Sequence, residues 1–228
     1  MYFHYDNYPY IAVIGDIRDS RKIENRSEAQ KKLQRVLLSV NEKYTEDIAS
    51  KFTITLGDEF QGLFHSGHRV LQVISEIERA LYPKKIRFGI GIGVITTDID
   101  PERALGADGP GYYMARNAVD FLKENENRKQ AALADIRLEA DGDNDECVAM
   151  LNSVLSLMCA IKDSWSERQR EIIWDMAEHM DNQTDVAARL GIRQPTVHKS
   201  LSKGYYYTYK NASETVERVL GEIRRRDA

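Results

Sequence analysis

The sequence predicts an α+β protein in which a ferredoxin-like βαββαβ domain is followed by an all-α domain. In the first half, short β-branched runs alternate with amphipathic stretches, and a Gly-Asp pair separates two of the strand-like runs. After about residue 140, the apolar residues recur only at helical spacing. We expect a first domain at residues 1–140 and a second at residues 141–228, joined by an acidic, glycine-containing linker.

The composition describes a chain that can bury a substantial core. It has 228 residues, 42% of them hydrophobic and 30% charged, and a net charge of −4. An acidic chain gives no overall electrostatic sign of nucleic-acid binding, although a basic face can lie on one module. Cys147 and Cys159 form neither a disulfide framework nor a CxxC metal site. With no signal-peptide pattern and no apolar run of about 20 residues, we expect a cytoplasmic protein without a membrane partner.

The elements of the first domain follow from apolar periodicity and turn signals. A capping box at Ser27 and Gln30 begins the first helix. A hairpin turns at Gly57 and Asp58. We expect strands at residues 10–14, 51–56, 60–64, 86–95 and 131–138, and helices at residues 27–48, 70–81 and 112–122.

Glycines mark two special places in the first domain. Gly89, Gly91 and Gly93 alternate along one expected strand, so one of its faces has no side chains and a helix or another group can approach it closely. Residues 105–111 (LGADGPG) form a loop whose N–H groups either make an anion-binding nest or belong to an ordinary turn.

The second domain contains two short helices separated by a tight turn. Ser166 caps a helix that ends near His179, and Asn182 begins the next helix. Gly191 ends that helix in a left-handed turn, and Pro195 stands near the first position of the following one. This spacing is typical of a helix-turn-helix, and the alternative is a helical hairpin used for dimerisation or packing.

The polar residues on the last of these helices suit base edges and phosphates in a major groove. The expected partner is double-stranded DNA, bound by a homodimer that contacts two half-sites. Arg193 and Lys203 are expected to contact phosphates. The residues expected to contact bases or nearby phosphates are Gln194, Thr196, His198 and Lys199.

Two aspartates of the first domain are candidates for a metal site. Asp16 follows the first strand and Asp58 lies in the hairpin turn, and these strands are neighbours in a ferredoxin-like sheet. Paired carboxylates with substrate phosphates suit Mg²⁺ or Mn²⁺ as a cofactor. The alternative is that both side chains cap their own turns. The candidates for holding a nucleotide or phosphate are Arg18, Ser20, Arg21, Gly57, Glu59 and Asp108.

Two segments resemble known families. The stretch SERQREIIWDMAEHMDNQTDVAARLGIRQPTVHKSL resembles the helix-turn-helix of sigma-factor region 4 and of LuxR-type regulators. The stretches FTITLGDEFQGLF and RFGIGIGVITTDI resemble class III nucleotide cyclases and GGDEF domains. That likeness implies metal ligands at Asp16 and Asp58, matches Glu59 to the GGDEF pattern, and makes Arg116 a candidate catalytic residue.

The cyclase resemblance has three departures. Ile54 replaces the purine-reading lysine, Tyr112 stands at the asparagine position, and Leu56 replaces a glycine of the GGDEF motif.

The whole chain is similar to the SatD family of bacterial proteins through the motifs GDIRDSR, LGDEFQGL and GADGPGYYMAR.

Three functional hypotheses follow. The first is a DNA-binding regulator whose cyclase-like domain binds a nucleotide or another phosphorylated ligand with a metal ion. The alternative is an enzyme, a metal-dependent nucleotidyl cyclase or nucleotidyltransferase, in which Arg116 stabilises charge on the phosphoryl group. The third is an interaction scaffold in which both modules have lost these roles.

Overall fold

The computed structural model describes residues 3, 5, 8–20, 25–126, 128 and 134–223. They form two compact units, which we call the α/β unit (Met1–Ser156 with Val216–Ala228) and the helical unit (Leu157–Thr215). The predicted domain boundary lies after residue 140. In the structure the division falls within helix α4 (Asp145–Asp163), which contributes residues to both units. Among the described residues, no helix has the length and apolarity to cross a membrane.

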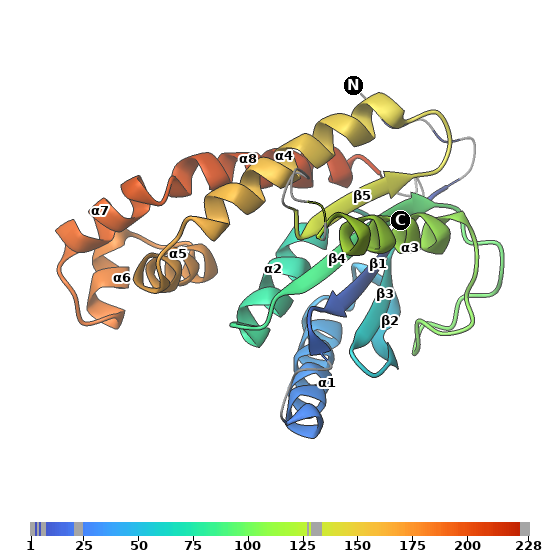
Figure 1. Cartoon of the computed structure of the whole chain (residues 1–228), viewed down its shortest axis with the longest axis horizontal. Helices are drawn as coiled ribbons and strands as arrows, with labels where there is room; N and C mark the ends of the chain where they lie inside the picture. Colours follow the sequence, from blue (N-terminus) through green and yellow to red (C-terminus); the bar gives the residue numbers. More distant parts are fainter. Residues whose placement is uncertain are drawn as a thin grey trace. The chain divides into compact units, whose positions relative to one another are not determined.

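The α/β unit is built on one five-stranded sheet of order β2-β3-β1-β4-β5 (Figure 1). The last strand pairs parallel to β4, and the other pairs are antiparallel. The elements up to β4 follow the order β-α-β-β-α-β, so the predicted βαββαβ plan is confirmed. The strands are β1 (Tyr10–Ile17), β2 (Ile48–Leu56), β3 (Glu59–Phe64), β4 (Ile86–Gly93) and β5 (Ile136–Ala140). The helices are α1 (Arg26–Lys43), α2 (Val70–Leu81) and α3 (Pro110–Asn125).

Several local predictions in this unit were wrong. The first helix, expected at residues 27–48, ends at Lys43, and residue 48 already belongs to β2. The last strand, expected at residues 131–138, lies at Ile136–Ala140. Strand β1 does not stop before Asp16 but continues to Ile17, because both neighbouring strands extend its hydrogen-bonded pairing to this end. Helix α1 is capped by Asn25, whose side chain accepts from the N–H of Glu28 at 3.1 Å, and not by Ser27. The side-chain amide nitrogen of Asn25 donates to the Glu28 carboxylate, so this pair satisfies the first turn two residues earlier than expected.

Helix α3 packs directly on the glycine face of β4, as the alternating glycines predicted (Figure 1). A Cβ atom at Gly91 would overlap the carbonyl oxygen of Gly111 and the amide nitrogen of Ala115. The alternate residues Phe88, Ile90 and Ile92 point to the opposite face and are almost fully buried. The missing side chains therefore let the helix backbone contact the sheet backbone.

The helical unit has its own hydrophobic core, to which two short helices contribute side chains. Helix α6 (Gln183–Arg189) is capped by Asn182, and Gly191 adopts φ = +63° in the turn before α7 (Gln194–Lys203). Ser166 and Gln169 form a capping box at the start of α5 (Glu167–His179), and α8 (Tyr206–Gly221) begins shortly after α7. The core residues are Trp165, Ile172, Ile173, Val186, Ala187, Val197, Leu201 and Tyr206.

Arg170, from the RQRE stretch, is part of this packing and not of the surface. Its guanidinium carbon lies 5.6 Å from the ring centre of Trp165 and 5.3 Å from that of Trp174. Its Nη2 donates to the backbone oxygen of Lys162 at 2.8 Å. The contacts of the buried guanidinium with two aromatic rings stabilise the packing around Arg170.

We expect Gly91→Ala to lower the free energy of unfolding by about 3 kcal/mol, because the added methyl group overlaps backbone atoms that cannot rotate away. Urea unfolding of the purified chain measures this loss. Gly106→Ala is the matched control, because no atom lies within 4 Å of its Cβ position and only its φ of +82° is unfavourable. The control should lose only about 1 kcal/mol. Equal losses in the two variants would contradict the close packing of α3.

Candidate functional site

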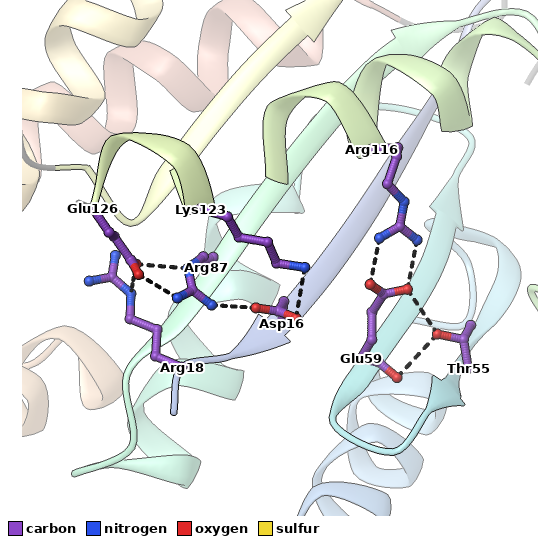
Figure 2. A network of polar contacts seen from close by, with 8 residues as sticks. All are labelled: Asp16, Arg18, Thr55, Glu59, Arg87, Arg116, Lys123 and Glu126. Atoms are coloured by element: carbon purple, nitrogen blue, oxygen red, sulfur yellow. Dashed lines mark hydrogen bonds and ion pairs between the residues drawn. The ribbon is translucent and has the colours of Figure 1, made fainter. Parts of the chain in front are cut away.

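Charged side chains form a row across three neighbouring strands of the α/β unit. Asp16 on β1 is paired in register with Glu59 on β3 and with Arg87 on β4. Helix α3 lies over this row and contributes Arg116 and Lys123 (Figure 2). These two residues are seven positions apart, which is about two helical turns, so they lie on the same side of the helix.

Asp16 is held by two cations. Arg87 donates to one of its carboxylate oxygens, and the ammonium of Lys123 lies 3.1 Å from the other. Arg87 also donates through Nε to Glu126 at 2.7 Å, and Glu126 forms an ion pair with Arg18 at 2.8 Å. A continuous chain of opposite charges therefore runs from Lys123 to Arg18 (Figure 2).

Glu59 is held by a two-pronged contact from Arg116. The two guanidinium nitrogens donate to its two carboxylate oxygens at 2.5 and 2.6 Å, and the hydroxyl of Thr55 donates to the same carboxylate at 3.1 Å. The hydrogen bonds from Arg116 hold the pKa of Glu59 below its usual value of 4.5, although burial acts in the opposite direction. Glu59 is therefore an anion at neutral pH and is already neutralised by its partner.

The network contains one more cation than carboxylates: its cations are Arg18, Arg87, Arg116 and Lys123, and its carboxylates are Asp16, Glu59 and Glu126. The Asp16 and Glu59 side chains are each only 11% exposed, whereas those of Arg116 and Lys123 are 39% and 37% exposed. The two most exposed side chains of the network are therefore cations, while Glu126 is 27% exposed and the exposed Asp120 acts electrostatically on Arg116. This arrangement favours an anion over a cation as a ligand.

The structure does not place Asp58 opposite Asp16 in the sheet. Asp58 lies in the turn after Gly57, which adopts φ = +62°, and the residue opposite Asp16 is Glu59. Both carboxylate oxygens of Asp16 already contact cations. A divalent ion at Asp16 would be repelled by Arg87 and Lys123, so the side chains as arranged do not fit a two-carboxylate metal site. The described part of the chain also contains no cluster of three acidic, histidine or cysteine side chains suited to a metal.

Other predicted ligand residues lie outside this network. Asp108 is held at the start of α3, where its carboxylate accepts from the hydroxyl of Tyr113 at 2.8 Å and from the N–H of Gly109 at 3.0 Å. The N–H of Asp108 donates to the hydroxyl of Thr97, and the N–H of Gly111 donates to the backbone oxygen of Val94. These two N–H groups therefore do not form an open anion nest. Ser20 follows β1 and is not among the residues that build the network, and Arg21 lies outside the described residues.

Tyr112 does not replace the asparagine of the cyclase pattern. Its side chain is buried in a core cluster with Ala12, Ile14 and Ala115, and burial raises the pKa of its hydroxyl. Its hydroxyl is buried and has no hydrogen-bond partner among the described residues.

Sequence reasoning missed three members of the network: Arg87, Lys123 and Glu126. Arg87 is the one charged residue in the apolar run IRFGIGIG, which marks it as a residue that needs a partner. Lys123 lies two helical turns after Arg116, so the helical period alone places both on one face. Glu126 follows the last residue of α3 and carries no comparable signal.

A second candidate surface lies on α7 of the helical unit. Val197 and Leu201 face the core, and all of the residues predicted to contact DNA are exposed. No ion pair joins Arg193, Lys199 or Lys203 to any described residue. The residues that form this exposed polar surface are Arg193, Gln194, Thr196, His198, Lys199 and Lys203.

The segment that contains α7 is basic. Residues 186–213 contain no aspartate or glutamate. Arg189 is committed to Asp175 and Asp181 and does not add to the free positive charge of the surface. The basic residues of the segment, histidine aside, are Arg189, Arg193, Lys199, Lys203 and Lys210.

The Glu59–Arg116 pair makes stability depend on pH. The pKa of Glu59 is lower in the folded chain, so the stabilisation is complete above its ordinary value of 4.5 and is lost as the pH falls through the folded value. Glu59→Gln should lower the free energy of unfolding by about 1 kcal/mol at neutral pH, allowing for solvent around Arg116. Urea unfolding at several pH values measures the difference, which should shrink in acid. Glu102→Gln, in the exposed pair with Lys51, is the control and should have little effect. A Glu59→Gln difference that stays constant with pH would contradict this assignment.

The solved structures that match this chain do so with low similarity. A bacterial light-regulated adenylyl cyclase is 13% identical, with a TM-score of 0.41, and the match covers 57% of this chain and 75% of that chain. The guanylate cyclase domain from Catenaria anguillulae in complex with GTP is 14% identical, with a TM-score of 0.34, covering 49% and 70%. A regulator of polyketide synthase expression from Bifidobacterium adolescentis is 11% identical, with a TM-score of 0.29, covering 96% and 88%. Scores this low do not bear on the activity of this chain.

The sequence of the chain matches a known protein family over most of its length. No curated protein matches the chain. The profile of the SatD family matches residues 10–216, which include the ionic network and α7. Because this match spans most of the chain, the protein belongs to the SatD family.

Proposed function

We propose that this protein is a DNA-binding regulator and that α6 and α7 form its helix-turn-helix. The observation that carries the proposal is the outer face of α7, which presents hydrogen-bonding and basic side chains without any acidic residue. Such a face combines base-edge donors and acceptors with phosphate-binding cations. A helical hairpin used only for packing needs neither.

The dimensions of α7 support this proposal. α7 has 10 residues, and a B-DNA major groove of about 12 Å width admits one α-helix, whose diameter with side chains is about 10–12 Å. With Val197 and Leu201 in the core, the exposed residues of α7 are the ones proposed to face the groove. Lys199 and Lys203, one helical turn apart, then lie along one line and contact the phosphate backbone. A symmetric dimer would place two such helices on two half-sites.

The ligand of the α/β unit is proposed to be a phosphorylated anion such as a nucleotide. Support comes from the solvent exposure of Arg116 and Lys123. We do not extend the proposal to nucleotidyl cyclisation, because Tyr112 is buried in the core and both oxygens of Asp16 are held by cations.

DNA binding should fall steeply with salt and should depend on the lysines of α7. We expect Lys199→Ala with Lys203→Ala to weaken binding to all sequences and to reduce the slope of log K against log salt concentration by about two. Fluorescence anisotropy with a labelled duplex across a tenfold range of salt measures both effects. Lys210→Ala is the matched control, because Lys210 is an exposed lysine of the same unit outside α7. Wild-type protein without salt-dependent binding, or a double variant with an unchanged slope, would sink the proposal.

A nucleoside triphosphate should stabilise the α/β unit even in EDTA, because cations and not a metal ion meet the phosphates. Thermal unfolding with and without ATP measures the shift in Tm, and Arg116→Met with Lys123→Met should abolish it. Each variant is compared with itself without ligand, so that any loss of stability cancels. Lys51→Met is the control, because Lys51 pairs with Glu102 outside the network. A shift that requires Mg²⁺ or Mn²⁺ and is lost in Asp58→Asn would restore the metal assignment and overturn this one.

A further inference from the structure

Three helices of the helical unit are linked by a relay of side-chain hydrogen bonds. Gln194, the first residue of α7, donates from Nε2 to Oε1 of Gln183 on α6 at 2.8 Å. Gln183 in turn donates from its own Nε2 to the hydroxyl oxygen of Tyr207 on α8 at 3.0 Å. Both ends of the Gln183 amide are therefore engaged, and the middle of the relay is held from two sides.

The relay leaves Gln194 with a defined set of free groups. A glutamine amide offers two N–H donors and a carbonyl oxygen with two lone pairs. One N–H of Gln194 is committed to Gln183, so one N–H and the whole carbonyl oxygen remain. The N–H group and the carbonyl oxygen that remain are the donor and the acceptor that Gln194 can offer to a ligand.

We propose that Gln194 reads an adenine in the major groove and that Gln183 and Tyr207 are positioning residues for this contact. The proposal rests on the DNA-binding function proposed above. Adenine presents N7 as an acceptor beside the N6 amino group as a donor, which matches the free N–H and carbonyl oxygen of a glutamine amide. Guanine presents two acceptors at the same positions, so the carbonyl oxygen of Gln194 would face another oxygen and reject it.

The position of Gln194 suits this role. In helix-turn-helix proteins, base edges are contacted by the N-terminal residues of the second helix. Gln194 is the first residue of α7 and is exposed, and Pro195 after it restricts the backbone at this end. Gln183 is partly buried and both ends of its amide are engaged in the relay, so in this proposal it acts through Gln194 and does not touch the base itself.

The experiment is a selection of bound duplexes from a random library by the full-length chain. Wild type should enrich adenine at one position of each half-site, and Gln194→Ala should lose that preference at that position only. Gln183→Ala and Tyr207→Phe should reduce the adenine preference about tenfold, because one bidentate contact is loosened, while affinity for random duplex stays within about twofold. Thr184→Ala, an exposed neighbour on α6, is the control and should keep the preference.

A conservative variant separates positioning from packing. Gln183→Glu keeps an acceptor for Gln194 and can accept from the hydroxyl of Tyr207, so it should recover the adenine preference that Gln183→Ala loses, despite weaker overall binding. Thermal unfolding of each variant is measured in parallel.

The outcomes distinguish the two proposals. No salt-dependent DNA binding by wild type would remove the DNA-binding function and this inference with it. DNA binding with a base preference that Gln183→Ala and Tyr207→Phe leave unchanged would overturn this inference alone and leave the relay as a purely structural link. Lower melting temperatures with an unchanged preference would also overturn it.

Discussion

The contact between the backbone of α3 and the glycine face of β4 positions the rest of the α/β unit. Because Gly91 has no side chain, the carbonyl of Gly111 and the amide of Ala115 approach the strand within backbone contact. A helix seated that closely cannot slide or rotate, so its side chains have fixed places above the sheet. Arg116 and Lys123 are thereby held over two neighbouring strands, and the charges of those strands must be compatible with them.

The row beneath α3 would be unstable without that helix. Asp16 and Glu59 are directly opposite each other on adjacent strands, and like charges in such a pair repel. Each carboxylate is instead neutralised by a separate cation of α3, and Arg87 adds a third from β4. The network therefore helps to hold α3 against the sheet, and it also sets the charge of this part of the sheet. A ligand that binds there must compete with contacts that already stabilise the fold, which favours ligands of high negative charge.

Local patterns predicted the elements better than they predicted the site. The hairpin turn at Gly57, the cap at Ser166 and the left-handed Gly191 depend on neighbouring residues, and the structure has all three. The pairing of Asp16 depends instead on strand register, which arises from contacts between segments far apart in the sequence. For the same reason Lys123 and Glu126 were missed, because their contacts require the placement of α3 on the sheet. The contact of Asp108 with Tyr113, five residues later in the first turn of α3, was likewise not predicted, because it depends on where that helix begins.

The uneven distribution of charge along the chain affects how it meets a polyanion. The protein is acidic overall, yet the segment around α7 has basic residues and no acidic one, so the remainder of the chain carries more negative charge than the total suggests. The proposed DNA-binding surface around α7 would attract a duplex, while the net negative charge of the remainder of the chain would oppose its approach elsewhere. Under the proposed function, this asymmetry would favour encounters in which α7 faces the duplex. Discrimination of this kind acts on the rate of encounter and needs no base contact at all.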